Sequence, residues 1–176
     1  MTRYILTGAP GAGKTALLRL LERRGHAVVE EAATDVIALE QALGRDQPWT
    51  DPAFIDLIVA LQRQRQIAAQ GACFFDRSPA CTWALAEFLG FEPSPGLEAE
   101  MTRIKAEHTY ERRVFFIENL GFVTPTAARR ISYEDALRFE QVHIETYRRL
   151  GYDLVCIPPG ELEARADQVL ENTPFQ

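Results

Sequence analysis

Short apolar runs alternate along this chain with longer segments in which apolar and polar residues are mixed. The runs are bounded by glycine, proline or charged residues, and they predict strands at 3–7, 26–30, 72–76, 113–117 and 153–157. The segments between them carry apolar residues at helical spacing, and they predict helices at 14–24, 35–44, 53–70, 79–88, 97–110, 133–150 and 162–170.

Most of the expected strands are apolar throughout, instead of alternating between apolar and polar residues. Strands of this kind are buried on both faces, which is typical of a parallel sheet covered by helices on either side. The pattern therefore predicts a three-layer α/β fold. The length of 176 residues suits one domain spanning 1–176.

The segment at about 118–132 interrupts this alternation. It contains Gly121, Pro125 and the adjacent Arg129 and Arg130, and we expect it to form a mobile lid. Lids that close over nucleotides carry arginines, which neutralise charge developing on the γ-phosphate. Either arginine is a candidate for that role, and the alternative is a solvated pair that begins a helix.

The segment that joins the first expected strand to the first expected helix has the spacing G-x-x-x-x-G-K-[ST]. It reads Gly8-Ala9-Pro10-Gly11-Ala12-Gly13-Lys14-Thr15. Glycines allow several backbone N–H groups to point at phosphate oxygens, and the helix that follows adds its positive N-terminal dipole. In this P-loop motif Lys14 reaches the β- and γ-phosphates, and the Thr15 hydroxyl can ligate Mg²⁺. We expect a nucleotide site for ATP and Mg²⁺ at Gly8 to Thr15; the alternative is a chance match in a glycine-rich turn.

An acid and an arginine follow the strand expected at 72–76. In open α/β sheets, ligands bind at the carboxyl ends of the strands. If this strand lies beside the first, Asp76 faces the metal at Thr15, and Arg77 points at a transferred or acceptor phosphate. The alternative is a strand-end Asp near the next helix, with Ser78 as the helix N-cap.

Two adjacent glutamates, Glu30 and Glu31, follow the strand expected at 26–30 and should reach the same edge of the sheet. One of them could accept a proton from an acceptor hydroxyl or hold a ribose or base. An acidic first turn of the next helix is an equally good interpretation of the residues themselves. Asp35 is a weaker candidate.

Composition limits the classes of partner and compartment. The net charge of −6 argues against nucleic acid or an anionic membrane as a partner. No run of about 20 apolar residues occurs, and nothing has the pattern of a signal peptide, so we expect no transmembrane segment and a cytoplasmic location. Lysine occurs only at Lys14 and Lys105, so one of two lysines occupies the phosphate-binding position.

The remaining cysteine and aromatic residues have simple interpretations. Cys73 and Cys156 lie in apolar runs, so we expect buried thiols, and the three histidines show no metal-ligand spacing. The aromatic residues expected in the core are Trp83, Phe88 and Phe91. Trp49 and Phe54, near the loop at 46–52, fit either the core or an acceptor pocket.

Over nearly its whole length the chain resembles small bacterial AAA-domain P-loop ATPases. These are similar to nicotinamide riboside kinase domains and, more distantly, to nucleoside and nucleotide kinases. The resemblance is carried by Thr7 to Thr15, Val29-Glu30-Glu31-Ala32-Ala33, Phe75-Asp76-Arg77-Ser78-Pro79, Ala128-Arg129-Arg130 and Tyr147-Arg148-Arg149-Leu150-Gly151-Tyr152. It implies a five-stranded parallel sheet in the order 2-3-1-4-5. Asp76-Arg77-Ser78 looks like the Asp/Glu-Arg-Ser motif of deoxynucleoside kinases, and Glu31 falls where those kinases carry a carboxylate.

Two functions remain open. The first is an ATP-dependent phosphotransferase that moves the γ-phosphoryl to a small nucleoside- or nucleotide-like acceptor. Its candidate catalytic residues are Lys14, Glu31, Asp76, Arg77 and Arg129 or Arg130, with Mg²⁺ on Thr15 and Asp76. The second is a nucleotide-dependent ATPase or GTPase switch, or a binding module, without a small-molecule acceptor. Oligomeric state does not follow from the sequence.

Overall fold

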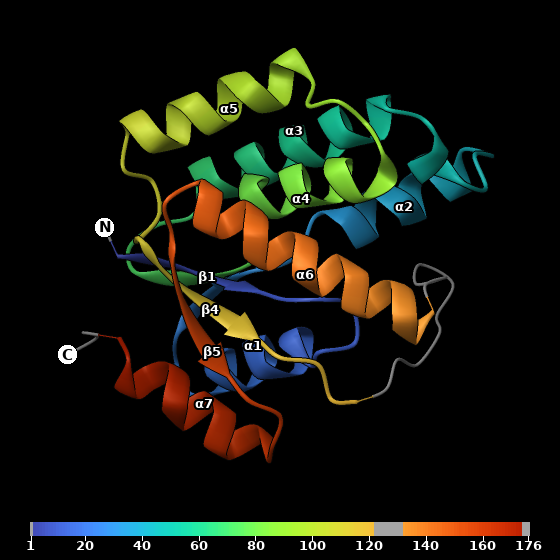
Figure 1. The fold of residues 1–176 in the computed structure, drawn as a ribbon. Helices are drawn as coiled ribbons and strands as arrows, with labels where there is room; N and C mark the ends of the chain where they lie inside the picture. The colour runs from blue at the N-terminus through green and yellow to red at the C-terminus, as the bar shows by residue number, and fades with distance from the viewer. Residues whose placement is uncertain (1, 122–131, 174–176) are drawn as a thin grey trace.

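In a computed structural model, which describes residues 2–121 and 132–173, five parallel strands form one sheet (Figure 1). The order is β2-β3-β1-β4-β5, as the resemblance implied. The strands are β1 (Arg3–Thr7), β2 (Ala27–Val29), β3 (Cys73–Asp76), β4 (Arg113–Ile117) and β5 (Asp153–Ile157). Because β1 is central, the loop that leaves it lies at the middle of the carboxyl edge, between the ends of β3 and β4.

Helices cover both faces of the sheet. They are α1 (Lys14–Arg23), α2 (Ala33–Ala42), α3 (Ala53–Ala68), α4 (Pro79–Leu89), α5 (Pro95–Ala106), α6 (Tyr133–Arg149) and α7 (Leu162–Glu171), with a short 3₁₀ turn at η1 (Pro48–Thr50). Figure 1 shows α1 and α7 together on one face, and α4 and α6 on the other beneath α3 and α5. The predicted three-layer α/β fold is therefore confirmed.

The two faces of β1 explain the layers. Tyr4 and Leu6 are buried among α1 and α7 residues, while Ile5, between them, packs with Tyr147 of α6 and Ala80 of α4. Successive side chains of a strand point to opposite faces, so a strand that is apolar throughout contributes to both cores. The continuous apolar runs in the sequence are the direct consequence of this double burial.

Three details differ from the sequence predictions. Helix α5 begins earlier, at Pro95, because the Ser94 side chain accepts a hydrogen bond from the Leu97 N–H and proline suits the first helical turn. The same helix ends earlier, and His108 beyond it has a left-handed backbone with φ of 48°. The expectation of a buried Cys156 is wrong: this residue is exposed because β5 is an edge strand, whereas Cys73 in β3 is buried.

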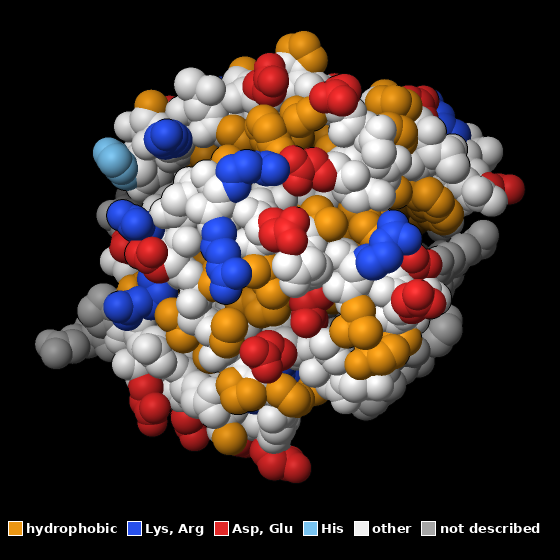
Figure 2. Space-filling view, in the orientation of Figure 1, with side chains coloured by type: hydrophobic (Ala, Val, Ile, Leu, Met, Phe, Trp, Pro, Cys, Tyr) orange, Lys and Arg blue, Asp and Glu red, His pale blue; other side chains and the backbone are white. Residues whose placement is uncertain are grey.

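The surface is mixed in charge. On the face shown in Figure 2, acidic and basic side chains are interspersed, with apolar side chains between them. Several of the surface charges are paired, for example Arg149 with Glu87 and Arg24 with Asp167. Among the described helices, none is both long and apolar enough to cross a membrane.

Candidate nucleotide and acceptor site

The loop between β1 and α1 has the backbone that its glycines require. Gly8, Gly11 and Gly13 have φ angles of 132°, 86° and 83°, a region that L side chains rarely adopt. A Cβ on Gly8 would lie 2.3 Å from the carbonyl oxygen of Ile117 at the end of β4. Glycine at position 8 is therefore needed both for the turn and for the close approach of β4.

Lys14, the first residue of α1, folds back onto this loop. Its Nζ donates a hydrogen bond of 2.8 Å to the carbonyl oxygen of Ala9, and the residue is only 6% exposed. Burial lowers the pKa of Lys14 to about 7; the positive charge of Arg77 acts in the same direction, and the carboxylates of Asp76 and Glu31 partly oppose it. A bound phosphate would favour the charged amine and compete with Ala9 for it.

Asp76 ends β3 directly beside the loop, because Leu6 in β1 is paired with it across the sheet. The Thr15 hydroxyl lies 3.4 Å from Oδ2 of Asp76, while the buried Oδ1 has no hydrogen-bond partner within residues 2–121 and 132–173. Burial raises the pKa of Asp76, although the charge of Lys14 opposes this. A cation held here would stabilise the ionised carboxylate and satisfy the unpaired oxygen.

This arrangement fits Mg²⁺ bound in the manner of P-loop proteins. Mg²⁺ prefers oxygen ligands and keeps several waters and substrate phosphates, so one hydroxyl and one carboxylate suffice from the protein. Within the described parts of the chain, no group of three or more His, Cys, Asp or Glu residues forms a site made wholly of side chains. Thr15 and Asp76 are therefore the residues that would hold the ion together with nucleotide oxygens.

Arg77 is held in place by three separate contacts. Its Nε lies 2.8 Å from a Glu31 oxygen, its Nη1 lies 3.1 Å from Nε2 of His143, and its backbone N–H donates to the carbonyl oxygen of Leu6. Its backbone φ of 72° is unusual for a residue with a side chain, and such strain is concentrated at functional sites. The guanidinium is thus fixed at the carboxyl edge of the sheet next to Asp76.

The partners of His143 define its protonation. Nδ1 lies 2.9 Å from the carbonyl oxygen of Phe139, which can only accept, so Nδ1 carries the proton and Nε2 accepts from Arg77. Burial lowers the pKa of His143 well below its usual range, and the charge of Arg77 adds to this effect. A neutral imidazole is therefore the form that supports Arg77.

The two glutamates after β2 point in different directions. Glu31 faces the cavity, where it contacts Arg77 and accepts a hydrogen bond of 2.7 Å from Thr34. Burial works against ionisation of Glu31, but the charges of Arg77 and Lys14 and the hydrogen bond from Thr34 together outweigh it, and the pKa of Glu31 is lowered. Glu30 pairs instead with Arg19 on the surface.

Arg65 of α3 supports the segment that carries Glu31. Its Nη1 donates to the carbonyl oxygens of Glu30 and Glu31, at 3.1 Å and 2.5 Å, and its Nη2 pairs with Asp35. The side chain of Asp35, the weaker sequence candidate, is therefore engaged with α3. Of the three acids considered after β2, Glu31 is the one whose side chain lines the cavity.

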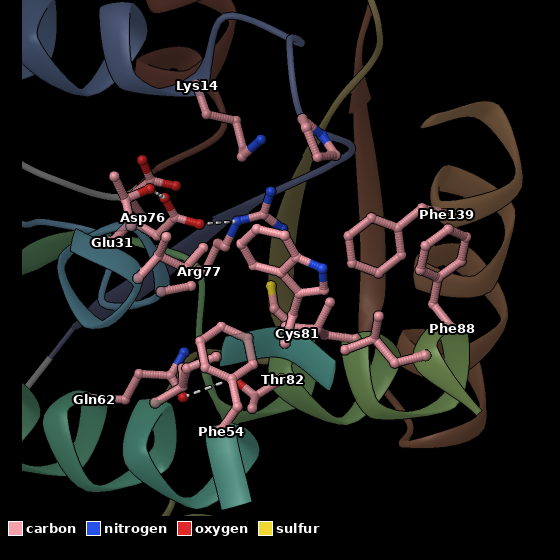
Figure 3. A pocket seen from close by; sticks show the side chains of 18 of the residues that line it. Lys14, Glu31, Phe54, Gln62, Asp76, Arg77, Cys81, Thr82, Phe88 and Phe139 are labelled. Atoms are coloured by element: carbon pink, nitrogen blue, oxygen red, sulfur yellow. Dashed lines mark hydrogen bonds and ion pairs between the residues drawn. The ribbon is translucent and has the colours of Figure 1, made fainter. Parts of the chain in front are cut away.

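A cavity of about 460 Å³ extends from the loop across the carboxyl edge of the sheet (Figure 3). Lys14, Thr15, Glu31, Asp76 and Arg77 line one end of it. The rest is mainly apolar and is formed by α2, η1, α3, α4 and α6, with lining residues that include Trp49, Phe54, Ile58, Leu85, Phe88 and Phe139. A charged end and an aromatic chamber thus share one space.

The chamber contains few polar groups. Gln62 of α3 accepts a hydrogen bond of 2.9 Å from Thr82 of α4 through its Oε1, which leaves its amide N–H groups as donors. Asp135, in the first turn of α6, lines the same cavity. Apolar walls with a few fixed polar groups are typical of small-molecule sites.

The sequence interpretation of these lining residues was incomplete. Phe88, expected in the core, lines the cavity, and so do Trp49 and Phe54, which fitted either place. Gln62 was missed, although it follows Phe54 and Ile58 at intervals of four residues on the same face of α3. That spacing was the available signal in the sequence, because a polar residue on the apolar face of a helix is unusual and indicates a specific role.

Of the remaining residues predicted for the site, some lie in the phosphate-binding loop and two lie outside the described residues. Ala9 and Ala12 are fully buried in the loop, and Pro10 lines the cavity. Arg129 and Arg130, proposed for the lid at about 118–132, lie outside the described residues.

A family model described as an AAA domain matches residues 3–165. The chain belongs to this AAA-domain family. No curated protein matches its sequence.

Solved structures with the same fold include two kinases and NadR protein. Deoxyadenosine kinase from M. mycoides, with products dCMP and a flexible dCDP bound, matches with a TM-score of 0.58 at 11% identity over 97% of each chain. Thymidylate kinase from Ehrlichia chaffeensis matches with a TM-score of 0.63 at 12% identity, again over 97% of each chain. NadR protein in complex with NR matches with a TM-score of 0.70 at 17% identity. The match covers 99% of this AAA-domain chain but 51% of NadR. At these identities the likeness establishes the fold.

Proposed function

We propose that this AAA-domain protein is an ATP-dependent phosphotransferase that moves the γ-phosphoryl group to a hydroxyl or phosphate of a small nucleoside- or nucleotide-like acceptor. One observation carries the proposal: a single cavity joins the loop that would bind the donor phosphates to a chamber large enough for a second small molecule. A switch that transfers phosphate only to water has no need of such a chamber.

The chemistry of the chamber supports a flat heterocyclic acceptor. Aromatic side chains favour stacking with a planar ring, and Trp49, Phe54, Phe88 and Phe139 line the walls. Gln62 offers amide donors to a ring carbonyl or nitrogen, because its own carbonyl is occupied by Thr82. The proteins similar in fold include a deoxyadenosine kinase with dCMP and dCDP bound and NadR protein with NR bound, which agrees with this class of acceptor.

The roles of the charged residues follow from their chemistry and neighbours. Lys14 binds the β- and γ-phosphate oxygens once it leaves Ala9. Thr15 and Asp76 would hold Mg²⁺, which neutralises charge on the nucleotide phosphates. Arg77 binds an acceptor oxygen or the transferring phosphoryl, and Arg129 or Arg130 adds positive charge from the lid.

In the transfer step Glu31 accepts the proton of the acceptor hydroxyl. The acceptor oxygen forms a bond to the γ-phosphorus as the bond from that phosphorus to the β–γ bridging oxygen breaks, which leaves ADP. The pairing of Glu31 with Arg77 keeps its carboxylate ionised and therefore able to take the proton. When the acceptor reacts through a phosphate, no proton transfer is needed and Glu31 binds the sugar.

The test is a screen for acceptors that accelerate ADP formation. Nucleosides, nucleoside monophosphates and nicotinamide riboside are supplied with ATP and Mg²⁺, and at least one is expected to raise the rate well above hydrolysis. With an acceptor that reacts through a hydroxyl, Glu31→Gln should lose the acceptor-dependent rate. Glu30→Gln is the matched control, because that side chain pairs with Arg19 outside the cavity. Hydrolysis that no acceptor changes would favour the nucleotide switch.

A further inference from the structure

Arg165 of α7 is a buried cation with no carboxylate within ion-pair distance among the described residues, although the charge of Glu118 acts on it from further away. The residue is 2% exposed, and within residues 2–121 and 132–173 its guanidinium donates only to backbone carbonyl oxygens. Nη1 donates to Ala12 at 2.8 Å, and Nη2 donates to Glu118 at 2.9 Å and reaches Ile157 at 3.5 Å. Burying a charge costs free energy unless the charged group is paired or hydrogen-bonded, and arginine remains charged in proteins.

The contact with Ala12 lies in the phosphate-binding loop itself. Ala12 precedes Gly13, and the peptide between them is trans, as are all described peptide bonds. In a trans peptide the C=O and the N–H point in opposite directions. A group that holds the Ala12 carbonyl away from the cavity therefore directs the Gly13 N–H toward it.

Gly13 also gives Arg165 the room to make this contact. A Cβ added to Gly13 would lie 3.2 Å from Nη1 of Arg165. The backbone φ of 83° already disfavours a side chain at this position. The last glycine of the motif thus allows two things at once, the turn into α1 and the close approach of the guanidinium.

The other contacts of Arg165 anchor it to the sheet. Glu118 follows β4, and its N–H donates to the carbonyl oxygen of Ile157 at the end of β5. Arg165 donates to the carbonyl oxygens of both residues, so it joins the ends of β4 and β5 to the loop. In Figure 1, α7 lies beside α1 on one face of the sheet. The hydrogen bond to Ala12 places Arg165 against the loop that precedes α1.

We propose that Arg165 is a positioning residue for the phosphate site, which orients the Ala12–Gly13 peptide so that the Gly13 N–H binds a nucleotide phosphate oxygen. The inference rests on the nucleotide-binding part of the proposed function and is independent of the acceptor. Lys14 binds the Ala9 carbonyl from within the loop segment itself, whereas Arg165 binds the Ala12 carbonyl from α7.

The test compares three variants for ADP and ATP affinity by titration calorimetry. Arg165→Met removes the donors, Arg165→Lys keeps the charge with a less suitable donor geometry, and Val169→Ala is the control. Val169 is fully buried one turn further along α7, where it belongs to the hydrophobic core and has no hydrogen-bonding side chain. Arg165→Met should weaken nucleotide binding by about tenfold or more, as expected for a lost charged hydrogen bond. Arg165→Lys should lie between Arg165→Met and the wild type, and Val169→Ala should stay within about twofold of the wild type.

A spectroscopic readout separates positioning from loss of stability. The backbone amide proton of Gly13 should shift downfield when ADP binds to the wild type and to Val169→Ala, and shift much less in Arg165→Met. If Arg165→Met does not fold, the ADP-induced shift of the Gly13 amide proton is measured in Arg165→Lys, and a reduced shift there supports the positioning role. An unchanged Gly13 shift and unchanged affinity in the Arg165 variants would overturn the positioning role. A wild type that binds no nucleotide would instead overturn the proposed function and this inference together.

Discussion

The Nε of Arg77 lies 2.8 Å from a carboxylate oxygen of Glu31, which joins the end of β3 to the segment after β2 at the charged end of the cavity. Both side chains line the cavity and both are largely buried. A buried pair of this kind contributes little net stability, because desolvation offsets the attraction, but each partner fixes the orientation of the other. An acceptor entering the chamber would meet a preformed pair of charges.

The support of Arg77 by His143 leads to the first prediction. His143→Phe removes the acceptor for Nη1 and should lower the free energy of unfolding by about 1–3 kcal/mol, the cost of an unsatisfied buried donor. His143→Gln retains an acceptor oxygen and should lose less. Urea unfolding of the two variants measures this difference, and equal losses would show that the hydrogen bond to Arg77 is not what matters.

The pKa of Lys14, about 7 in the nucleotide-free protein, predicts proton uptake on nucleotide binding. At pH 8 most Lys14 is neutral, and a bound phosphate favours its charged form, so binding takes up a proton. Affinity should therefore fall as pH rises above 7, by up to about tenfold per pH unit. Below pH 7 the amine is already charged, so the contribution of Lys14 to this dependence disappears.

Calorimetry in two buffers of different ionisation enthalpy measures the uptake directly. Lys14→Met should abolish the part of the pH dependence that lies above pH 7. Uptake at pH 8 that is the same in the variant and the wild type would assign the proton to another group.

The close approach at Gly8 gives a stability prediction with an internal control. Gly8→Ala places a Cβ 2.3 Å from the Ile117 carbonyl oxygen, whereas Gly25, which also has a positive φ, has nothing within 4 Å of an added Cβ. Gly25→Ala should cost about 1–2 kcal/mol from the left-handed backbone. Gly8→Ala should cost clearly more, because the loop or β4 must move, and urea unfolding of both variants checks the order.

Much of the fold, but less of the candidate site, could be predicted from the sequence. Strand runs such as 113–117 are apolar because both faces of the sheet are covered, and the loop motif depends on local spacing, so both are visible along the chain. Neighbours distant in sequence are not visible in this way. The contact of Arg165 with Ala12 joins residues 153 positions apart, and Phe88 lines the cavity because α4 packs against α6.

Gln62 provides the prediction for acceptor recognition. Gln62→Leu preserves the side-chain size but removes the amide, so the acceptor KM should rise by about tenfold while the KM for ATP stays unchanged. Gln64→Leu on the exposed side of α3 is the matched control. Equal effects of both substitutions on the acceptor KM would remove Gln62 from the proposed acceptor site.

The most direct test of the proposed phosphotransfer follows the γ-phosphoryl group itself. ATP labelled at the γ-phosphorus is incubated with the wild type, Mg²⁺ and each acceptor found in the screen, and the products are separated. We predict that the label moves to an acceptor and that, for an acceptor that reacts through a hydroxyl, Glu31→Gln reduces this transfer at least about a hundredfold, as for loss of a general base. Label found only in inorganic phosphate, at a rate that no acceptor changes, would contradict phosphotransfer to a small molecule.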